Sequence, residues 1–364
     1  MINQLTFCQD GMIRDKVEIA IKRLQAFEPE EGYYVAFSGG KDSQCVYHLC
    51  KMAGVKFDAH YAVTSVDPPE LVRFIKTNYP DVEFERQHDK DGKPITMWSL
   101  IASHTLPPTR KVRYCCSALK ETGGQGRIVV TGVRWAESVN RKNTHDVVDI
   151  RGKRSRKVAD ENGAEYRTNK HGDLIMNDDN DAARRTVETC YRTRKTMVNP
   201  IVDWTDEDVW NFLNGNDLPH CSLYDEGFTR LGCIGCPLSG SKNMMRDFER
   251  WPKYKDLYIR AFQKMIDNHP GEIKILDPNA NTKFKLYDME PENTFEGGQE
   301  HTSLLPQTLS DGMCSDGLKN NSGGGYAGSR IGYAKAAETV YRFFVTNCNG
   351  AEYVYKHWLE MGAT

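Results

Sequence analysis

YYVAFSGGKDSQCVYHLC, from Tyr33 to Cys50, changes its pattern halfway. An apolar run breaks at Ser38, Gly39 and Gly40, and apolar residues then return with helical spacing, which predicts a buried strand, a tight turn and a helix N-terminus. Glycines let a ligand approach the backbone closely, and the first turn of a helix presents unpaired N–H groups and a positive dipole end. We therefore expect this turn to bind a phosphate or pyrophosphate group.

Side chains around the turn suit the same ligand. Ser38 and Ser43 could add hydroxyl donors, Ser43 could also cap the helix, and Lys41 could supply a full positive charge. The stretch is not a Walker A loop, because that motif needs an earlier glycine where Tyr34 or Val35 stands. An ordinary glycine-rich turn without a ligand is the structural alternative.

Composition places the chain among soluble proteins. Its 364 residues are enough for one large α/β domain with appendages or for two domains, and 27% of them are charged. The chain has no stretch of about 18 apolar residues, and its first residues, MINQLTFCQDG, lack the pattern of a signal peptide. We expect a cytoplasmic protein without a membrane partner, in which the eleven cysteines serve as thiols, metal ligands or redox groups rather than as disulfides.

Strands and helices are predicted to alternate after the glycine turn. The apolar run 55–66 predicts a second strand, and 68–79 predicts a helix with prolines at its start, where a missing N–H does no harm. Such alternation predicts a parallel sheet, whose ligands lie at the carboxyl ends of the strands, and Asp67 lies at one of these ends. Asp67 is equally suited to capping the helix. Further strands are expected at 82–87, before Gly132 and at 198–204, and further helices at 10–27, 97–103, from 205 onward and at 251–269.

A second group of polar side chains follows the strand that ends at Gly132. Its members are Arg134, Glu137, Ser138 and Arg141. Their spacing of three or four residues places them on one face of a helix or turn. The net charge of the whole chain is only -2, so a local basic cluster of this kind indicates an anionic ligand. A solvent-exposed helix with internal salt bridges is the alternative.

Four cysteines have the spacing of a metal site. Cys115 and Cys116 are adjacent in a basic segment, whose cations favour the thiolate form that binds metals. Cys233 and Cys236 form a C-x-x-C pair on a glycine-containing turn. Four thiolates can hold a [4Fe-4S] cluster or a zinc ion, and spacing alone does not distinguish the two. If strain prevents the adjacent pair from binding together, Cys190 can replace one of its members.

The rest of the chain predicts appendages to this core. Residues 149–181 are polar and rich in Gly, Asn, Asp and Lys, which predicts an insertion on the rim of the sheet, with a hairpin as its expected form. Its basic first half could contact nucleic acid, although no aromatic residues are interleaved for base stacking. Residues 291–330 predict a flexible loop, and 334–361 predict one or two final helices. We therefore divide the chain into an N-terminal helix (1–30), a nucleotide-binding domain (31–237) and a mainly helical C-terminal extension (238–364).

Several motifs resemble those of one family. SGGKDS at 38–43 is similar to the pyrophosphate loop, or PP-loop, of the adenine nucleotide alpha hydrolase superfamily. VDPPE, G-x-R-x-x-E-S-x-x-R, NPIVDWTDEDVW, LYDEGF and G-C-x-x-C-P follow in the order of the phosphoadenosine phosphosulfate (PAPS) reductase family of that superfamily. The resemblance extends over 33–237 outside the insertion. It implies a Rossmann-like α/β fold, with a parallel sheet flanked by helices.

This resemblance assigns roles to the residues named above. The family implies ATP, adenylylsulfate (APS) or PAPS as ligand, and the implied nucleotide contacts are Ser38, Gly39, Gly40, Lys41, Asp42, Ser43, Asp67, Gly132, Arg134, Glu137 and Ser138. The CC pair followed by C-x-x-C is similar to the cluster-binding pattern of APS reductases, which favours [4Fe-4S] over zinc. The sequence contains no match to the C-terminal Glu-Cys-Gly-x-His motif of sulfonucleotide reductases.

The missing motif leads us to expect ATP pyrophosphatase chemistry. A substrate oxygen would attack the α-phosphate, while the loop amides, Mg²⁺ and the side chains of Lys41, Arg134 and Arg141 stabilise the developing charge. The adenylated product would be ready for sulfur transfer, as in DNA phosphorothioation, which implies a nucleic-acid substrate and a sulfur-donor protein as partners. Two alternatives stay open: an APS or PAPS reductase that releases sulfite, and a non-catalytic nucleotide-binding subunit with structural zinc.

Overall fold

The structure is a computed structural model that describes residues 5–7, 13–152, 154–269, 273–276, 340–343 and 350–361. Its residues group into two compact units. The sheet unit comprises Met1–Val63, Asp67–Arg86 and Lys120–Gly232, and the cysteine unit comprises Thr64–Val66, Gln87–Leu119 and Cys233–Thr364. The division at residues 30 and 237 stays a prediction, and the loop predicted at 291–330 lies outside the described residues.

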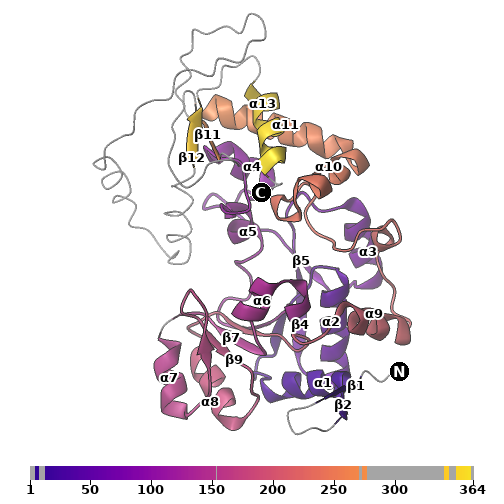
Figure 1. Cartoon of the computed structure of the whole chain (residues 1–364), viewed down its shortest axis with the longest axis vertical. Helices are drawn as coiled ribbons and strands as arrows, with labels where there is room; N and C mark the ends of the chain where they lie inside the picture. The colour runs from indigo at the N-terminus through magenta and orange to yellow at the C-terminus, as the bar shows by residue number, and fades with distance from the viewer. Residues whose placement is uncertain are drawn as a thin grey trace, which may run out of the picture. The chain divides into compact units, whose positions relative to one another are not determined.

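The sheet unit is built on an eight-stranded mixed sheet in the order β5-β4-β3-β6-β10-β7-β9-β8. The first five of these strands are parallel: β5 (Glu83–Glu85), β4 (Phe57–Ala62), β3 (Tyr33–Ala36), β6 (Ile128–Val130) and β10 (Thr196–Val198). Their carboxyl ends therefore share one edge of the sheet. The predicted α/β class with a Rossmann-like sheet is confirmed, with helices packed on the strands (Figure 1).

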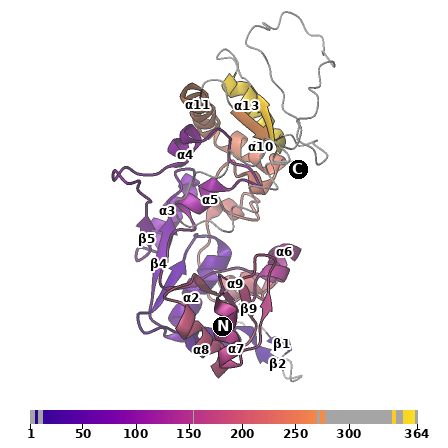
Figure 2. The same cartoon turned by 90° about the vertical axis from the view of Figure 1, so that its left-hand side faces the viewer.

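The predicted insertion enlarges the sheet instead of only decorating its rim. It contributes β7 (Val148–Ile150), β9 (Leu174–Met176) and β8 (Arg167–Thr168), which pair antiparallel beyond β10. Helix α7 (Ser155–Asn162) crosses between these strands and lies beside α8 (Asp181–Cys190), as Figure 2 shows. The sheet is mixed for this reason, whereas the alternation of strands and helices predicted parallel pairing alone.

Two helices pack against the helix that follows β3. Helix α1 (Lys16–Ala26) and helix α9 (Asp206–Gly215) both contact α2 (Lys41–Ala53). On the other side of the glycine turn, α3 (Pro69–Asn78) contacts the short helix η2 (Ser222–Tyr224). Among the described residues, no helix is both long enough and apolar enough to cross a membrane.

Several element boundaries differ from the sequence predictions, and each has a local cause. Helix α1 begins at Lys16 rather than at residue 10, because β1 (Leu5–Phe7) pairs with β2 (Ile13–Asp15) and the Asp15 side chain caps the helix. The strand predicted at 198–204 ends at Val198, because Pro200 has no N–H for a ladder and the chain turns there. Within 334–361, a strand, β12 (Val340–Phe343), precedes the final helix.

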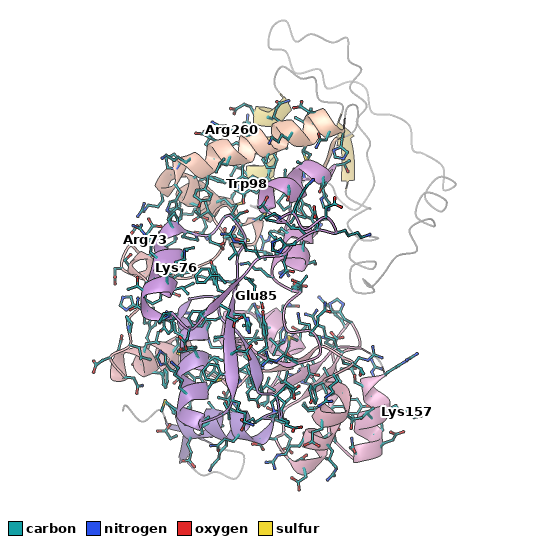
Figure 3. All side chains as sticks on the ribbon, turned by 180° about the vertical axis from the view of Figure 1, so that it is seen from behind. Arg73, Lys76, Glu85, Trp98, Lys157 and Arg260 are labelled. Carbon is teal, nitrogen blue, oxygen red and sulfur yellow. The ribbon has the colours of Figure 1, made fainter. Side chains whose placement is uncertain are left out.

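The cysteine unit is mainly helical. Its longest helix, α11 (Pro252–Asn268), packs against α4 (Met97–Ser103) and α13 (Gly350–Met361). The core of this contact is aromatic. Trp98, labelled on α4 in Figure 3, has its ring centroid 5.1 Å from that of Tyr258, and the Trp358 ring centroid is 4.7 Å from that of Tyr258. The remaining elements are α5 (Tyr114–Leu119), η3 (Pro237–Ser239), α10 (Ser241–Arg250) and the hairpin of β11 (Ile273–Leu276) with β12.

Candidate functional site

The glycine turn joins the carboxyl end of β3 to the N-terminus of α2. Gly39 has a φ of +72°, and a Cβ at this position would lie 2.7 Å from the Ile75 side chain, so both conformation and space require glycine. Gly40 is the N-cap residue of α2, and no side chain caps the helix there. The side chains that meet this thirteen-residue helix at its positive end are Asp42 in the first turn and Tyr224, whose hydroxyl accepts a hydrogen bond from Lys41 N at 2.8 Å.

Two serines hold the turn in this shape. The Ser43 hydroxyl accepts a hydrogen bond from Ser38 N at 3.2 Å and donates one to the Gly40 carbonyl at 2.9 Å. Ser38 Oγ also donates to Ser43 Oγ at 3.1 Å. These bonds fix the curvature of the backbone, and their predicted role as phosphate donors stays a prediction.

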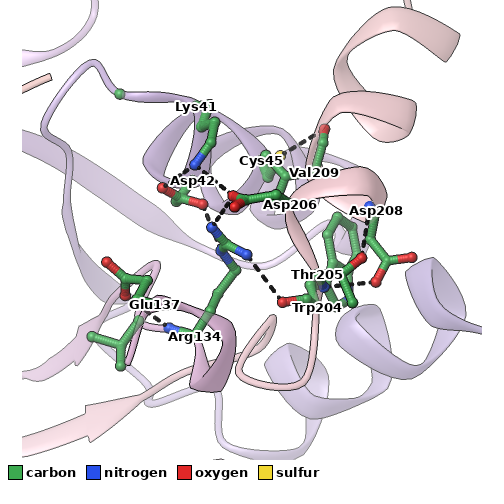
Figure 4. A network of polar contacts seen from close by, with 12 residues as sticks. Lys41, Asp42, Cys45, Arg134, Glu137, Trp204, Thr205, Asp206, Asp208 and Val209 are labelled. Carbon is green, nitrogen blue, oxygen red and sulfur yellow. Dashed lines mark hydrogen bonds and ion pairs between the residues drawn. The ribbon is translucent and has the colours of Figure 1, made fainter. Parts of the chain in front are cut away.

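A buried guanidinium organises the charges beside the turn (Figure 4). Arg134 is only 1% exposed, and it donates to Asp42 Oδ1 at 2.6 Å, to Asp206 Oδ1 at 2.7 Å and to the Trp204 carbonyl at 3.1 Å. Burial acts to lower the pKa of Arg134, but Asp42 and Asp206 outweigh it and raise the value. Arg134 is therefore a fixed cation that ties the start of α2 to the start of α9.

Lys41 completes the same network. Its Nζ lies 3.0 Å from Asp206 Oδ1 and 3.4 Å from Asp42 Oδ2. The hydrogen bond with Lys41 lowers the pKa of Asp206, burial opposes this effect, and Arg134 adds to it. Because 69% of the Asp206 side chain is exposed, an incoming anion could take its place beside the ammonium group.

The polar residues that follow Gly132, at the carboxyl end of β6, lie beside the glycine turn. Gly132 packs so closely that a Cβ would lie 3.0 Å from the Asp42 backbone. Glu137 accepts from Arg134 N at 3.1 Å and lies 3.4 Å from Arg141 Nε. Ser138 caps α6 (Val139–Thr144) by accepting from Arg141 N. The structure thus brings these residues together, and their contacts with a nucleotide stay predictions.

Two further residues beside the turn were not identified as site residues from the sequence. Asp206 follows Thr205, which caps α9, and its side chain reaches back to Lys41. Tyr224 accepts a hydrogen bond from Lys41 N at 2.8 Å. Both belong to motifs noted in the sequence, WTDEDVW and LYDEGF, but nothing in the local pattern indicates these long-range contacts. Asp67 is buried before α3, whose N-cap residue is Pro68.

Four thiols form a second candidate site in the cysteine unit. Cys115 and Cys116 lie in α5, and Cys233 and Cys236 flank the turn at Gly235, which has a φ of +69°. The hydrogen bond with Cys116 raises the pKa of Cys115, followed by burial and by the charges of Cys116, Cys233 and Cys236. All four thiols therefore share one electrostatic environment. Within the described part of the chain, however, no group of three or more His, Cys, Asp or Glu residues is arranged so that it could hold a metal ion.

Other contacts support the thiol turn. Asp247 Oδ2 accepts from Gly235 N at 3.0 Å, and Ile234 N donates to the Val66 carbonyl at 2.8 Å. Burial raises the pKa of Asp247 to about 6. The proposed substitute ligand Cys190 belongs to the sheet unit, where it is buried in α8 and where burial raises its pKa. Its role as a ligand stays a prediction.

Comparison with known proteins identifies the family. A family model described as phosphoadenosine phosphosulfate reductase domain matches residues 32–239, which is more than half of the chain. The chain belongs to this family. The motif resemblance is confirmed, and the match spans both the glycine turn of the sheet unit and the C-x-x-C turn of the cysteine unit in this PAPS reductase-family protein.

Matches to individual relatives are short or distant. Adenosine 5'-phosphosulfate reductase of Oceanobacillus iheyensis is 35% identical over 60 residues, which are 16% of this chain and 25% of that protein. Phosphoadenosine 5'-phosphosulfate reductase of Xylella fastidiosa is 40% identical over 43 residues, which are 12% and 18% of the two chains. An uncharacterized protein of Methanocaldococcus jannaschii is 21% identical over 247 residues, which are 65% of this chain and 42% of that one. The chain thus spans less than half the length of each of these relatives.

Solved structures give only weak similarities. FMN adenylyltransferase of Candida glabrata, in complex with FAD and inorganic pyrophosphate, has 15% identity and a TM-score of 0.34, covering 60% of this chain and 64% of that one. PAPS reductase of Candida auris, a phosphate complex, has 13% identity and a TM-score of 0.32, covering 63% and 96%. At these TM-scores neither similarity carries an argument about this site.

The first prediction concerns the left-handed glycine of the turn. We expect Gly39→Ala to abolish nucleotide binding, because the new Cβ would push against Ile75 and displace the amides of the turn. Gly54→Ala is the matched control, since Gly54 has a φ of +67° but no atom within 4 Å of its Cβ position. Equilibrium binding of labelled ATP measures both variants. Equal affinities in the two variants would contradict this role of the turn.

The second prediction uses the raised pKa of Asp247. A carboxyl whose folded-state pKa is raised stabilises the fold only while it is protonated, so this stability is present below the ordinary pKa of 3.8 and is lost as the pH rises toward 6. Asp247→Asn keeps an acceptor for Gly235 N and does not ionise. The free energy of unfolding of the variant, relative to the wild type, should rise by about 1–3 kcal/mol between pH 4 and pH 8. Denaturant titrations at several pH values measure it, and a pH-independent difference would contradict the prediction.

Proposed function

We propose that this protein binds ATP on the turn from Ser38 to Ser43 and releases pyrophosphate by adenylyl transfer to an oxygen nucleophile. The observation that carries the proposal is the glycine turn at the N-terminus of α2 with Lys41 beside it, at the carboxyl edge of the parallel strands. Backbone N–H groups at such a helix end favour phosphate oxygens, and this edge is where open α/β sheets bind their ligands.

The proposed reaction places the largest charge change on the departing pyrophosphate. The nucleophile's oxygen forms a bond with the α-phosphorus, and the bond from phosphorus to the bridging oxygen breaks, so its electron pair leaves with pyrophosphate. Lys41 and the amides of α2 stabilise this charge. Arg134 does not need to touch the nucleotide for this purpose, because its contacts with Asp42 and Asp206 hold both carboxylates in place.

Mg²⁺ fits the donor chemistry of the same network. Asp42 and Asp206 supply carboxylate oxygens, the ligands that Mg²⁺ prefers, and both lie next to Lys41. Both carboxylates also accept from Arg134, so a metal ion here would share them with that guanidinium. A bound Mg²⁺ would neutralise phosphate charge during the transfer.

A [4Fe-4S] cluster fits the donor chemistry of the four thiols in the cysteine unit. Its support is that four cysteines are the usual ligand set for such a cluster and that Cys115, Cys116, Cys233 and Cys236 all belong to the cysteine unit. The side chains would have to reorient on binding, because no group of residues described in the structure is arranged around a metal position. The cluster would supply redox or sulfur chemistry, with zinc as the structural alternative.

Reduction of APS or PAPS is the second candidate function. It is supported by the family and by relatives named as APS and PAPS reductases. The sequence lacks the C-terminal Glu-Cys-Gly-x-His motif, so the attacking thiol of that reaction has no assigned residue. A third candidate is a non-catalytic nucleotide-binding subunit. It would bind nucleotide on the turn but would release neither pyrophosphate from ATP nor sulfite from APS or PAPS.

The acceptor and the sulfur donor stay predictions. Nucleic acid is the acceptor implied by the resemblance to phosphorothioation enzymes. The helix of the insertion offers exposed cations, and Lys157 on α7 projects away from the sheet (Figure 3), with 84% of its side chain exposed. Exposed lysines of this kind are also common on surfaces that bind nothing.

The third prediction tests the proposed reaction with labelled ATP and Mg²⁺ under anaerobic conditions. The wild type should release pyrophosphate and AMP, and Lys41→Met should lower the rate by about 100-fold, because the stem remains while the charge beside the phosphates is lost. Lys51→Met, at the other end of α2, is the matched control and should retain the rate. Sulfite release from APS or PAPS without pyrophosphate from ATP would establish the reductase candidate instead.

The fourth prediction concerns metal content. Anaerobically purified protein should contain about four iron and four acid-labile sulfide atoms per chain. Cys233→Ser and Cys115→Ser should lose them. Cys221→Ser, a buried thiol of the sheet unit, should retain them. Zinc without iron in the wild type would contradict the cluster.

A further inference from the structure

His145 is oriented as a proton acceptor at the carboxyl edge of the sheet. It follows α6, and its Nδ1 lies 2.6 Å from Asp149 Oδ2. A carboxylate only accepts hydrogen bonds, so Nδ1 carries the proton and the lone pair is on Nε2. Within the described residues, no hydrogen bond joins Nε2 to another side chain, and 24% of the histidine side chain is exposed. The imidazole is therefore fixed on one side and accessible on the other.

Asp149 is itself held in position. Its side chain is 4% exposed, Oδ1 accepts from Asp146 N at 3.0 Å, and Oδ2 accepts from Asn199 Nδ2 at 3.0 Å. Asn199 is fully buried and contacts the Thr131 hydroxyl. A buried carboxylate with several donors stays in one orientation, so it fixes the tautomer and the angle of the ring.

The insertion clamps the backbone of the same histidine. Arg167 of β8 donates through Nη2 to the Lys142 carbonyl and to the His145 carbonyl at 3.3 Å each, and to Asp146 Oδ2 at 2.9 Å. Trp135, which follows Arg134, donates to the same His145 carbonyl at 2.9 Å. The insertion supplies both Arg167 and Asp149, so its structural effect is to hold His145 at this edge.

The sheet places His145 and the nucleotide turn on the same edge. Thr131 follows β6, Asn199 follows β10 and His145 precedes β7, which runs antiparallel to β10. In the sheet, β7 lies three strand positions away from β3, so the distance between these two strands is about 14 Å. Gly132, next to Thr131, packs against the backbone of Asp42. The glycine turn and His145 therefore lie on the same edge of the sheet, within one unit.

We propose that His145 is a catalytic base of the adenylyl transfer, positioned by Asp149, Asn199 and Arg167. The proposal rests on the proposed function. As the acceptor oxygen bonds to the α-phosphorus, its proton moves to the lone pair of Nε2, and the electron pair of the breaking phosphorus–oxygen bond leaves with pyrophosphate. The Asp149 carboxylate stabilises the imidazolium, which returns the proton to water. The ring contacts Asp149, and the neighbouring charged groups are Asp146, its partner Arg167 of β8, and Arg141 and Lys142 in the last turn of α6.

The test uses ATP with water as acceptor and compares full-length variants. His145→Asn keeps an N–H donor for Asp149 but has no Nε2. We expect its kcat to fall by about 100-fold or more, its KM for ATP to stay unchanged, and the fall of kcat toward acidic pH to disappear, because that limb reports protonation of the base. His145→Ala should regain part of its activity with added imidazole, which a structural role would not produce. His171→Asn, an exposed histidine of the insertion, should behave like the wild type.

The possible outcomes separate the two proposals. If His145→Asn retains the wild-type kcat and acidic limb while Lys41→Met loses activity, the role of His145 is overturned and the nucleotide reaction stands. If ATP affinity falls together with kcat, and imidazole restores nothing in His145→Ala, the histidine is structural and the proposal is also overturned. If the wild type releases no pyrophosphate, both proposals fail.

Discussion

The arrangement of the sheet unit depends on the hydrogen-bonded ion pairs that the buried guanidinium of Arg134 forms with Asp42 and Asp206. The guanidinium comes from the segment after β6, and it binds carboxylates at the start of α2 and at the start of α9. A buried cation without partners is costly, and removing one partner of a buried ion pair typically costs about 3–5 kcal/mol. The three elements are therefore held together at the glycine turn. The same contacts place Asp206 beside Lys41, so the fold and the charge of the candidate site share one cause.

The two candidate sites rest on different physical devices. At the glycine turn, Gly39 has a φ of +72° and Gly40 precedes the first turn of α2, so the chain passes directly from strand to helix N-terminus. At the thiol turn, Gly235 leaves no room for a Cβ, which would lie 2.4 Å from the Phe248 ring. Asp247 and Tyr258 then hold the neighbouring backbone by hydrogen bonds. In both places glycine allows a tight bend of the backbone, and hydrogen bonds from side chains that are distant in the sequence hold the bent backbone in place.

Much of the fold could be predicted from the sequence, because the relevant signals are local. The strand, turn and helix around Ser38 to Ser43 are encoded in consecutive residues, and the structure contains them at the expected positions. Predictions failed where a neighbouring signal overrode periodicity, as when Pro200 ended β10 early and Asp15 delayed the start of α1. The hairpin expected in the insertion is present as Arg167–Thr168 paired with Leu174–Met176, whereas the pairing of Leu174–Met176 with β7 was not predicted, because it leaves no local pattern in the sequence.

By itself the sequence determined the family, the α/β class and the position of the glycine turn, because each is encoded in short motifs of consecutive residues. Only the tertiary structure decided which charges meet at that turn. Asp206 reaches Lys41 across 165 positions of sequence, and Asn199 reaches Asp149 across 50. Such partners follow from strand order and helix packing, not from local spacing. The orientation of His145 and the pairing of Arg134 are for this reason properties of the folded sheet.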